Sequence, residues 1–578
     1  MKFFHVYNER SFKGLEKNGL LNKDSGLKIQ HIFRLPEEMK FNQLAKKDGK
    51  LYNMIKEGNI PFYVDRIAGG TTYHSYNFDK RLIKEYRELL GDWFFGFQLH
   101  ESGSNRRRAE WATAIARMGH KGPYTMAEMD EKMIHKTSRL PDGTKLYALS
   151  QDSPEFFSTL KYAETYQEFT KEMLELFRRR MADTDNNIIP CDSYYMATKL
   201  QSDMGMRTFM PEVGCQIPLM RLAIALARGV ANVNNKTWGA YYECWREVKG
   251  IGYCMPCFNL EFLNEWYNKQ LPGTDDFTSY GENGGSSRLL QDRIYNHAYM
   301  SGADYFAEEW GLNCSYTDMQ EFTLSKYGML KKNFINRTLE MGKMKAIIPF
   351  AIVLPKEYSC IELPDIFTDW KLGEHSKTYL SSPLTEEEIN FFGHVEDVLK
   401  LIFARTENIG NEGHTLTNSR FGDLFDIIYE DTNDCALKKY DYLIDATKEG
   451  RFIKAKNGTD FKILDSSDIE RLASTITEIE KAIMPAYVEG LPYVVSTNDK
   501  GERFVTIFNN EGNERDLAKG DILHAEADKK VKIAFKDSVN PIVVASSTYA
   551  PVKVDIERVD DKSFNTTIPA ARYAVIKY

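Results

Sequence analysis

The sequence predicts an α/β protein: a (β/α)8 barrel, or TIM barrel, followed by a smaller α/β domain and a C-terminal antiparallel β-sandwich. Three observations lead to this prediction. Eight short apolar runs alternate with helical patterns up to residue 344, a new apolar run begins at Ile347, and after Pro492 the pattern changes to alternating strands with turn residues between them. Alternating strands and helices are typical of a parallel sheet, whereas successive short alternating strands are typical of antiparallel ones.

The eight apolar runs have the length and composition of strands that are buried on both faces of a parallel sheet. They lie at residues 3–7, 27–35, 60–65, 93–99, 188–194, 208–212, 238–243 and 303–309. Helical patterns separate most of them, at 41–55, 79–90, 106–118, 154–181, 218–230 and 286–300, and a helix at 319–341 closes the unit. Eight such units fit a closed barrel with inserted loops.

A doubly wound open sheet is the competing layout for these strands. Its ligand site would lie where the strand order reverses, and its dinucleotide-binding form carries Gly-x-Gly-x-x-Gly after a strand. No such motif follows a predicted strand, and the glycine-rich segment 281–285 lies in a polar loop, where it predicts a flexible turn.

We place the barrel at 1–344, the smaller α/β domain at 345–490 and the β-sandwich at 491–578. The second domain is predicted to hold strands at 347–354, 425–429 and 442–444 and helices at 384–403 and 469–483. The third is predicted from the alternating runs at 503–514, 530–535, 541–547, 552–557 and 573–578.

The composition excludes several classes of protein. The net charge is −8 with both signs interspersed, so no basic face predicts binding to nucleic acid. No apolar run approaches the length of a membrane span, and the start, MKFFHVYNERS, does not have the pattern of a secretory signal. The eight cysteines are scattered, which argues against a disulfide framework and for a cytoplasmic protein.

No metal or cofactor is predicted. Cys254 and Cys257 form one Cys-x-x-Cys motif. A single pair, without a second pair or a histidine beside it, is weak evidence for zinc, and two ordinary loop cysteines explain it better.

Acidic residues follow the ends of several predicted strands. The run 93–99 breaks off into His100 and Glu101, and the run 238–243 ends on Glu243. The carboxyl ends of barrel strands meet at one mouth, where active sites lie. Glycoside hydrolysis needs two carboxyl groups around one bond, one to protonate the leaving oxygen and one to attack the anomeric carbon or activate water. The pattern therefore predicts a glycoside hydrolase that acts on an oligosaccharide or glycoside.

The order of the three domains resembles the family 42 β-galactosidases and related clan A glycoside hydrolases, over the whole chain. The family's middle domain is flavodoxin-like. Local motifs that support the resemblance are Ser301-Gly302-Ala303-Asp304 before the last barrel strand, Lys326-Tyr327-Gly328 on the next helix, the strand starting at Ile347, Phe421-Gly422-Asp423-Leu424-Phe425-Asp426, and Tyr440-Asp441-Tyr442. The resemblance implies an unclassified or divergent family of the clan rather than family 42 itself.

The resemblance implies a catalytic pair. In clan A the acid/base glutamate ends strand four and the nucleophile ends strand seven, and these positions hold Glu101 and Glu243 here. The clan usually has asparagine before the acid/base, and this sequence has His100 instead. Glu309 and Glu212 form the alternative carboxylate pair, because a strand count lower by one would move Glu309 to strand seven.

Strand alternation adds a prediction of which side chains face the pocket. Phe95, Phe97, Leu99 and Glu101 are expected on one face, as are Tyr241 and Glu243. Retention of configuration needs carboxyl groups ~5 Å apart and inversion ~6.5–9.5 Å, and we predict retention. Two carboxyl groups this close resist ionising together, so the charge of the nucleophile is expected to raise the pKa of the acid.

Other polar and aromatic residues near the strand ends are expected to bind substrate. Hydrogen bonds to sugar hydroxyls are predicted for Asp65, Gln98, His100, Asn105, Asp192 and Tyr242, with Arg66 available to keep the nucleophile ionised. Trp245 and Trp310 are candidate stacking platforms for a sugar ring, although a tryptophan packed in the barrel wall is an equally good interpretation.

Two competing functions stay open at this point. A barrel that binds carbohydrate without cutting it has the same sequence pattern, because a fold alone does not establish catalysis. An α-glycosidase or a lyase that uses Asp192 is a further alternative. The middle domains of the relatives pack subunits into trimers, so the resemblance also implies a homo-oligomer.

Overall fold

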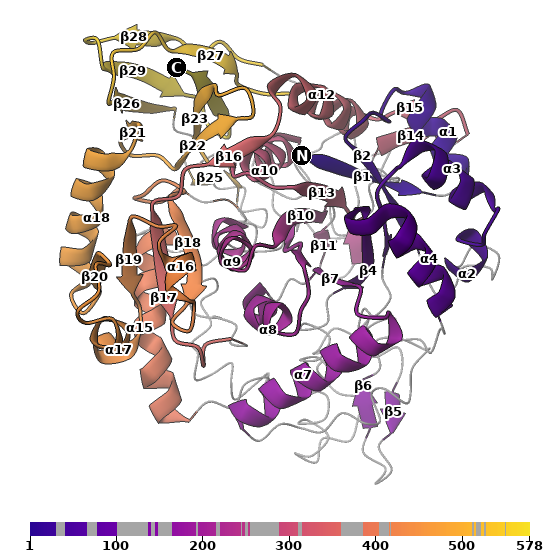
Figure 1. Ribbon diagram of the computed structural model, residues 1–578. Coiled ribbons are helices and arrows are strands. Elements are labelled where there is room, and N and C mark those ends of the chain that lie inside the picture. Colours follow the sequence, from indigo (N-terminus) through magenta and orange to yellow (C-terminus); the bar gives the residue numbers. More distant parts are fainter. Residues whose placement is uncertain are drawn as a thin grey trace.

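The computed structural model describes most of the chain, and the following account concerns the described residues (Figure 1). These are 1–7, 9–30, 41–65, 78–100, 137–139, 145–147, 165–191, 195–214, 220–243, 246–248, 252–254, 288–309, 315–318, 320–359, 385–403, 416, 418–510, 514–515, 522–524, 528–548 and 551–578.

The first part of the chain is a parallel, nearly closed barrel of eight strand positions. In ring order they are β1 (Lys2–Tyr7), β2 (Ser25–Gln30), β3 (Phe62–Asp65), β4 (Phe94–His100), β7 (Ile188–Cys191), β8 (Thr208–Phe209) with β9 (Glu212–Gly214), β10 (Thr237–Glu243) and β13 (Tyr305–Glu308). Parallel pairing of β1 with both β2 and β13 joins the first and last strands, as a barrel requires. The predicted fold class and all eight predicted barrel strands are confirmed.

The ring is weakest between β7 and β8. No ladder joins these two strands, but the backbone N–H of Met210 donates to the carbonyl of Pro190 at 3.1 Å. The open sheet considered as the competing layout is therefore wrong, because a doubly wound sheet would not pair its first strand with its last.

Helices cover the outside of the ring: α1 (Glu9–Lys17), α2 (Phe41–Leu44), α3 (Lys50–Gly58), α4 (Lys80–Leu90), α7 (Tyr166–Asp183), α8 (Thr198–Asp203), α9 (Met220–Val233), α10 (Arg288–Met300) and α12 (Lys326–Met341). Side-chain caps explain where several begin. Thr165 accepts from the N–H of Glu168 at the start of α7, and Ser325 accepts from the N–H of Gly328 at the start of α12. The helices predicted at 154–181 and 319–341 therefore begin later than the apolar periodicity suggested.

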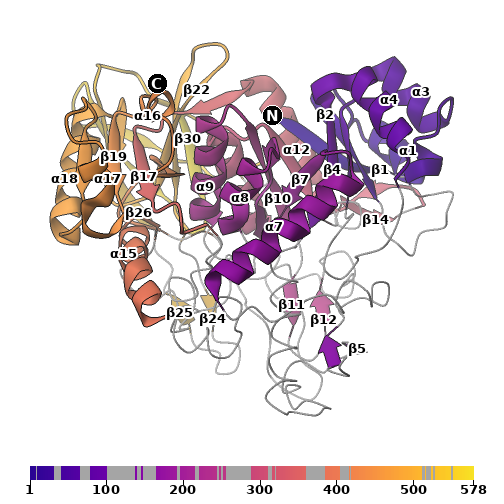
Figure 2. The same ribbon diagram turned by 60° about the horizontal axis from the view of Figure 1, so that its bottom comes forward.

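Short hairpins mark the end of the barrel where its strands finish. They are β5 (Thr137–Arg139) with β6 (Lys145–Tyr147), β11 (Arg246–Val248) with β12 (Gly252–Cys254), and β14 (Tyr316–Asp318) with β15 (Thr323–Leu324). Figure 2 shows β5, β11 and β12 together below the barrel.

The second unit is a four-stranded parallel sheet in the order β18 (Phe425–Tyr429), β17 (Phe350–Leu354), β19 (Tyr442–Asp445), β20 (Ile463–Asp465). Its helices are α15 (Glu386–Phe403), α16 (Asp434–Leu437), α17 (Arg451–Ala455) and α18 (Ile469–Ile483). In chain order the strands run 2-1-3-4, which is the order of a flavodoxin-like sheet.

The third unit consists of antiparallel sheets. One has the order β16 (Met344–Ala346), β22 (Tyr493–Asn498), β23 (Arg503–Phe508), β30 (Tyr573–Lys577), β27 (Ile542–Ala545), and the other β21 (Ala486–Val488), β26 (Lys529–Phe535), β29 (Ser563–Ile568), β28 (Ile556–Arg558). A separate hairpin pairs β24 (Glu514–Arg515) with β25 (Ile522–His524). Strands β16 and β21 precede residue 491, so the segments that flank the middle domain also pair with this unit.

Helix α9 lies between the barrel and the middle domain, as Figure 1 shows, and is buried along nearly its whole length. Arg228 on α9 pairs with Asp426 on β18 at 2.6 Å, and Arg221 pairs with Asp423 at 2.6 Å. Asp423 is also 3.0 Å from Nε2 of His297 on α10. Burial opposes ionisation of Asp423, but Arg221 and His297 outweigh it and hold the pKa of Asp423 well below its usual range. The two domains are therefore joined by buried charges.

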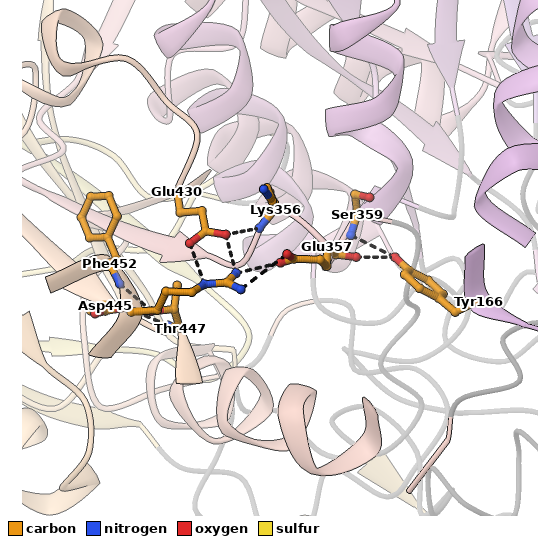
Figure 3. Close-up of polar contacts among 9 residues, drawn as sticks. Tyr166, Lys356, Glu357, Ser359, Glu430, Asp445, Thr447 and Phe452 are labelled. Atoms are coloured by element: carbon orange, nitrogen blue, oxygen red, sulfur yellow. Dashed lines mark hydrogen bonds and ion pairs between the residues drawn. The ribbon is translucent and has the colours of Figure 1, made fainter. Parts of the chain in front are cut away.

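Helix α7 also contacts the middle domain, at the loop that follows β17 (Figure 3). The hydroxyl of Tyr166 donates to the carbonyl of Glu357 at 2.6 Å and accepts from the N–H of Ser359 at 3.2 Å. The same loop is held from the other side, because Arg451 pairs with Glu357 and with Glu430.

A buried acid joins the middle domain to the third unit and predicts a pH dependence of stability. Glu480 on α18 accepts a 2.7 Å hydrogen bond from the hydroxyl of Tyr493 on β22. Burial raises the pKa of Glu480 from 4.5 to about 7, although the bond from Tyr493 works against it. The folded state thus holds this proton over a pH range in which the unfolded chain has lost it, so stability falls as pH rises from about 4.5 to about 7.

We therefore expect Glu480→Gln to be more stable than the wild type at pH 8, by about 3 kcal/mol, and no more stable at pH 4. Chemical denaturation at several pH values measures this. Glu478→Gln, an exposed change two residues away on the same helix, should show no such pH dependence. Parallel stability–pH curves for the wild type and Glu480→Gln would contradict the prediction.

Candidate functional site

The inner face of the barrel is identified by its packing. One buried cluster contains Phe4, Tyr63, Ile189, Cys191, Met210, Tyr241, Tyr305 and Ala307, from six of the strand positions. Their neighbours in the chain, such as Phe3, Val64, Phe209 and Phe306, belong to a different cluster that packs under the outer helices. Because side chains alternate along a strand, residues two apart from the inner cluster also face inward.

Strand β4 departs from the predicted alternation. Phe62 pairs with Phe94 and Tyr63 with Gly96, so Phe95 is an extra residue and forms a bulge. Phe95 lies inside, 5.3 Å from the ring of Phe4, whereas Phe97 lies outside, 4.5 Å from the ring of Phe78.

Gly96 makes the bulge possible. Its φ is +101°, and a Cβ on it would lie 2.3 Å from the carbonyl oxygen of Asn187. The prediction that Phe95, Phe97 and Leu99 share a face is therefore wrong, because Phe97 and Leu99 pack outside. Gln98 is the inward residue instead, since its register partner Ile189 belongs to the inner cluster.

A buried lysine lies at the centre of the polar part of this inner face. Lys28 on β2 is fully buried, and its ammonium lies 3.3 Å from the Asp65 carboxylate and 3.2 Å from the Tyr241 hydroxyl. It also donates to the backbone carbonyls of Glu308 (2.6 Å) and Glu309 (2.8 Å). Lys28 therefore links β2 to β3, β10 and the end of β13.

Acidic residues from separate strands lie on the same inner face as this lysine, and Asp65 is the one paired with it. Asp65 ends β3, Glu212 begins β9 and is the register partner of Tyr241, and Glu309 follows β13 two residues after the inward Ala307. Asp65, Glu212 and Glu309 are 1%, 1% and 2% exposed.

The adjacent residue Glu308 faces the other way. It pairs with Lys331 on α12 and accepts from the hydroxyl of Tyr295 on α10, both on the outer side of the barrel. The two neighbouring glutamates thus have different surroundings, and Glu309 is the one that faces the interior.

Gln98 differs from the other inward polar residues. Its side chain is fully buried, and among the described residues neither its amide nitrogen nor its amide oxygen has a hydrogen-bond partner. An unpaired buried amide of this kind costs on the order of 1–3 kcal/mol per group, so it needs an explanation.

The structure places the predicted site residues in four groups. Asp65, Gln98, Glu212 and Glu309 lie on the inner face as described. Tyr242 lies on the outer face, 5.6 Å from the ring of Tyr295, so it is not brought to the mouth. The backbone of Glu243 ends β10 and that of His100 ends β4. Outside the described residues are Glu101, Arg66, Asn105, Asp192, Trp245 and Trp310.

The strand count supports keeping Glu243 at the end of strand seven. Tyr242 pairs with Glu308, and the N–H of Glu309 donates to the carbonyl of Tyr242 at 2.9 Å. The next register position therefore brings the backbones of Glu243 and Glu309 side by side on neighbouring strands. A strand count lower by one, which would move Glu309 to strand seven, is wrong, because Glu309 follows strand eight.

Sequence reasoning missed Lys28, although a signal was present. In Leu-Lys-Ile-Gln the apolar residues Leu27 and Ile29 pack outside, and Lys28 between them must point into the barrel. A charged residue in a strand otherwise buried on both faces indicates a polar interior.

The carboxyl edge of the middle-domain sheet is a second place where this kind of fold binds ligands. Figure 3 shows that polar side chains at this edge bond to one another. Asp445 accepts from the N–H groups of Thr447 and Ile453, and Arg451 is bound by Glu357 and Glu430. These charged groups are therefore paired within the protein.

No group of three or more metal-binding side chains occurs among the described residues. In the same residues, no helix is long and apolar enough to cross a membrane. The prediction for Cys254 and Cys257 concerns side chains that are not described.

Comparisons with known proteins identify no sequence family: no protein-family model and no curated protein matches the chain. Two solved structures are similar over nearly its whole length. One is the catalytic module of a family 98 glycoside hydrolase from Streptococcus pneumoniae TIGR4, in complex with the LewisY pentasaccharide blood group antigen, with 9% identity, coverage of 100% of this chain and 98% of that one, and a TM-score of 0.38. The other is alpha-L-fucosidase isoenzyme 2 from Paenibacillus thiaminolyticus, with 7% identity, coverage of 99% and 96%, and a TM-score of 0.41. At these TM-scores the similarity carries no argument about activity, and the resemblance to family 42 stays a prediction.

Proposed function

We propose that this protein is a glycoside hydrolase whose active site lies at the carboxyl-end mouth of the barrel. One observation carries the proposal: Asp65, Glu212 and Glu309, from three separate strand positions, are buried on the inner face of the barrel, where Asp65 pairs with Lys28. Burying several carboxyl groups on one face is costly, so such an arrangement indicates a functional role. Acid/base cleavage of a glycosidic bond is the chemistry that a set of carboxyl groups supports without a cofactor.

The proposed mechanism is retaining. One carboxylate attacks the anomeric carbon while a carboxylic acid protonates the departing oxygen, and the same acid then activates the water that releases the sugar. We assign Glu243 as the nucleophile and Glu101 as the acid/base, with Glu309 and Glu212 as the alternative pair. The position of Glu243 at the end of strand seven supports its assignment.

Lys28 fits the mechanism as a fixed positive charge. A cation within the cluster favours the ionised form of neighbouring carboxyl groups, and the nucleophile must be ionised. Lys28 also fixes the backbone at Glu308 and Glu309, and the N–H of Glu309 in turn holds Tyr242, the residue before Glu243.

Hydrolysis of a panel of aryl glycosides tests the proposal. We expect the purified protein to release the phenol from at least one neutral β- or α-glycoside, and the first sugar product, followed by proton NMR, to keep the configuration of the substrate. A first product of opposite configuration would replace retention by inversion. Binding of a sugar without any turnover would favour the carbohydrate-binding barrel instead. Light scattering of the same sample measures the proposed homo-oligomer.

A further inference from the structure

Strands β3 and β4 carry, near their carboxyl ends, two adjacent polar side chains that face the inside of the barrel. Val64 is the register partner of Phe97, so the ladder continues with Asp65 beside Gln98. Both residues face inward, and both are buried. Neighbouring residues of a parallel ladder lie ~5 Å apart, so their side chains can contact the same ligand.

The two side chains are complementary in hydrogen bonding. The Gln98 amide has two donor hydrogens and one acceptor oxygen, and neither its nitrogen nor its oxygen has a partner in the part of the chain that the structure describes. The Asp65 carboxylate is an acceptor, and Lys28 lies beside one of its oxygens at 3.3 Å. A group that both donates and accepts satisfies such a pair best, and the hydroxyl group is the simplest one.

The charge of the site indicates which ligands fit. Glu212 and Glu309 add two further acidic groups to the inner face, and Lys28 is already bound to two carbonyls, Tyr241 and Asp65. An anionic sugar would therefore meet repulsion, whereas a neutral one would not.

We propose that Gln98 and Asp65 form a subsite that recognises two neighbouring hydroxyl groups of a neutral sugar, with Lys28 as the positioning residue for Asp65. This inference rests on the proposed function in taking the ligand to be a carbohydrate. It goes beyond that function by naming the residues that read the sugar and by excluding uronic acids.

Replacement of Gln98 should lower the affinity for the sugar without lowering the melting temperature. If Gln98 stabilised the fold, Gln98→Leu would instead melt at a lower temperature than the wild type. A glutamine kept for a ligand contributes nothing to the unliganded fold, so Gln98→Leu is expected to melt at the same or a higher temperature. Its affinity for the sugar should fall about 10- to 100-fold, which corresponds to the loss of two or three hydrogen bonds.

Gln291 offers a matched control. It is a buried glutamine on α10, outside the ring, and its amide nitrogen donates to the hydroxyl of Tyr295 at 2.8 Å. Gln291→Leu is expected to lower the melting temperature and to leave sugar affinity unchanged.

The experiment is calorimetric titration with methyl glycosides of neutral hexoses, their single-deoxy analogues and the matching uronates. We expect the wild type to bind a neutral glycoside and not its uronate. Removal of one particular hydroxyl should weaken binding to the wild type but not to Gln98→Leu, which identifies the hydroxyl that Gln98 reads.

Two results would overturn the subsite: equal affinity of the wild type and Gln98→Leu for the neutral glycoside, or tighter binding of the uronate. Neither depends on turnover. A protein that binds the glycoside through Gln98 without hydrolysing it would retain the subsite and lose the proposed enzyme activity, whereas hydrolysis that is insensitive to Gln98 would do the reverse.

Discussion

Glu243→Ala is expected to lower kcat/KM on aryl glycosides by at least about 10³-fold, because it removes the group assigned to attack the anomeric carbon. Sodium azide should then restore turnover. The small anion enters the space left by the carboxylate and attacks the same carbon, so the product should be a glycosyl azide of configuration opposite to the substrate. The measurement is a rate with and without azide, together with the NMR spectrum of the product.

Glu308→Gln is the control for this prediction. Glu308 lies beside Glu309 in the chain but faces the outer side of the barrel, where it pairs with Lys331. Its loss is expected to lower the melting temperature and to leave kcat/KM within a few-fold of the wild type below that temperature. A wild-type rate in Glu243→Ala would remove Glu243 as the nucleophile. Azide rescue of Glu309→Ala or Glu212→Ala would then assign that role to the alternative pair.

Much of the barrel could be predicted from the sequence because strands buried on both faces are continuous apolar runs. The runs around Phe62, Ile188 and Phe306 need no knowledge of their neighbours to be recognised, and all became strands. Helix starts were less predictable. Apolar periodicity continues past the true ends, and the caps at Thr165 and Ser325 decide where α7 and α12 begin.

The direction in which side chains face could not be predicted in β4. A single extra residue at Phe95 reverses the alternation for every residue after it, so Phe97 and Leu99 point outward and Gln98 inward. The glycine at 96 was the available signal, since a glycine inside a strand often marks a bulge. Glu101 lies outside the described residues, and the alternation used to place it inward is interrupted at this bulge.

The sequence predicted acidic residues inside the barrel but not their partners. Acidic strand ends indicated a mouth lined with carboxyl groups, and the structure brings Asp65, Glu212 and Glu309 to the inner face. Lys28, the partner of Asp65, is 213 residues from Tyr241 and 280 from Glu308 along the chain. Contacts over such separations depend on the closure and register of the ring, which local sequence patterns do not contain.

The buried ion pair between the barrel and the middle domain leads to the second prediction of a large effect, a loss of stability. Asp426 on β18 is fully buried and accepts from Arg228 at 2.6 Å, from Asn232 at 2.9 Å and from the hydroxyl of Tyr440 at 2.8 Å. A second nitrogen of Arg228 donates to the carbonyl of Phe425 at 2.9 Å. Burial, and next the negative charge of Asp426, raise the pKa of Tyr440 well above its usual value, so this hydroxyl stays a donor.

We expect Asp426→Asn to destabilise the protein by about 3–5 kcal/mol, because it leaves the guanidinium of Arg228 buried without a counter-charge. The loss should appear as an earlier first transition in chemical denaturation. The double variant Arg228→Met/Asp426→Leu removes both charges and fills similar volume, so it should recover most of the lost stability. A single variant as stable as the wild type would show that the pair does not hold the joint. A double variant no better than the single one would place the effect in the hydrogen bonds of Asn232 and Tyr440 rather than in the charge, and would reassign the contact between the domains to those neutral groups.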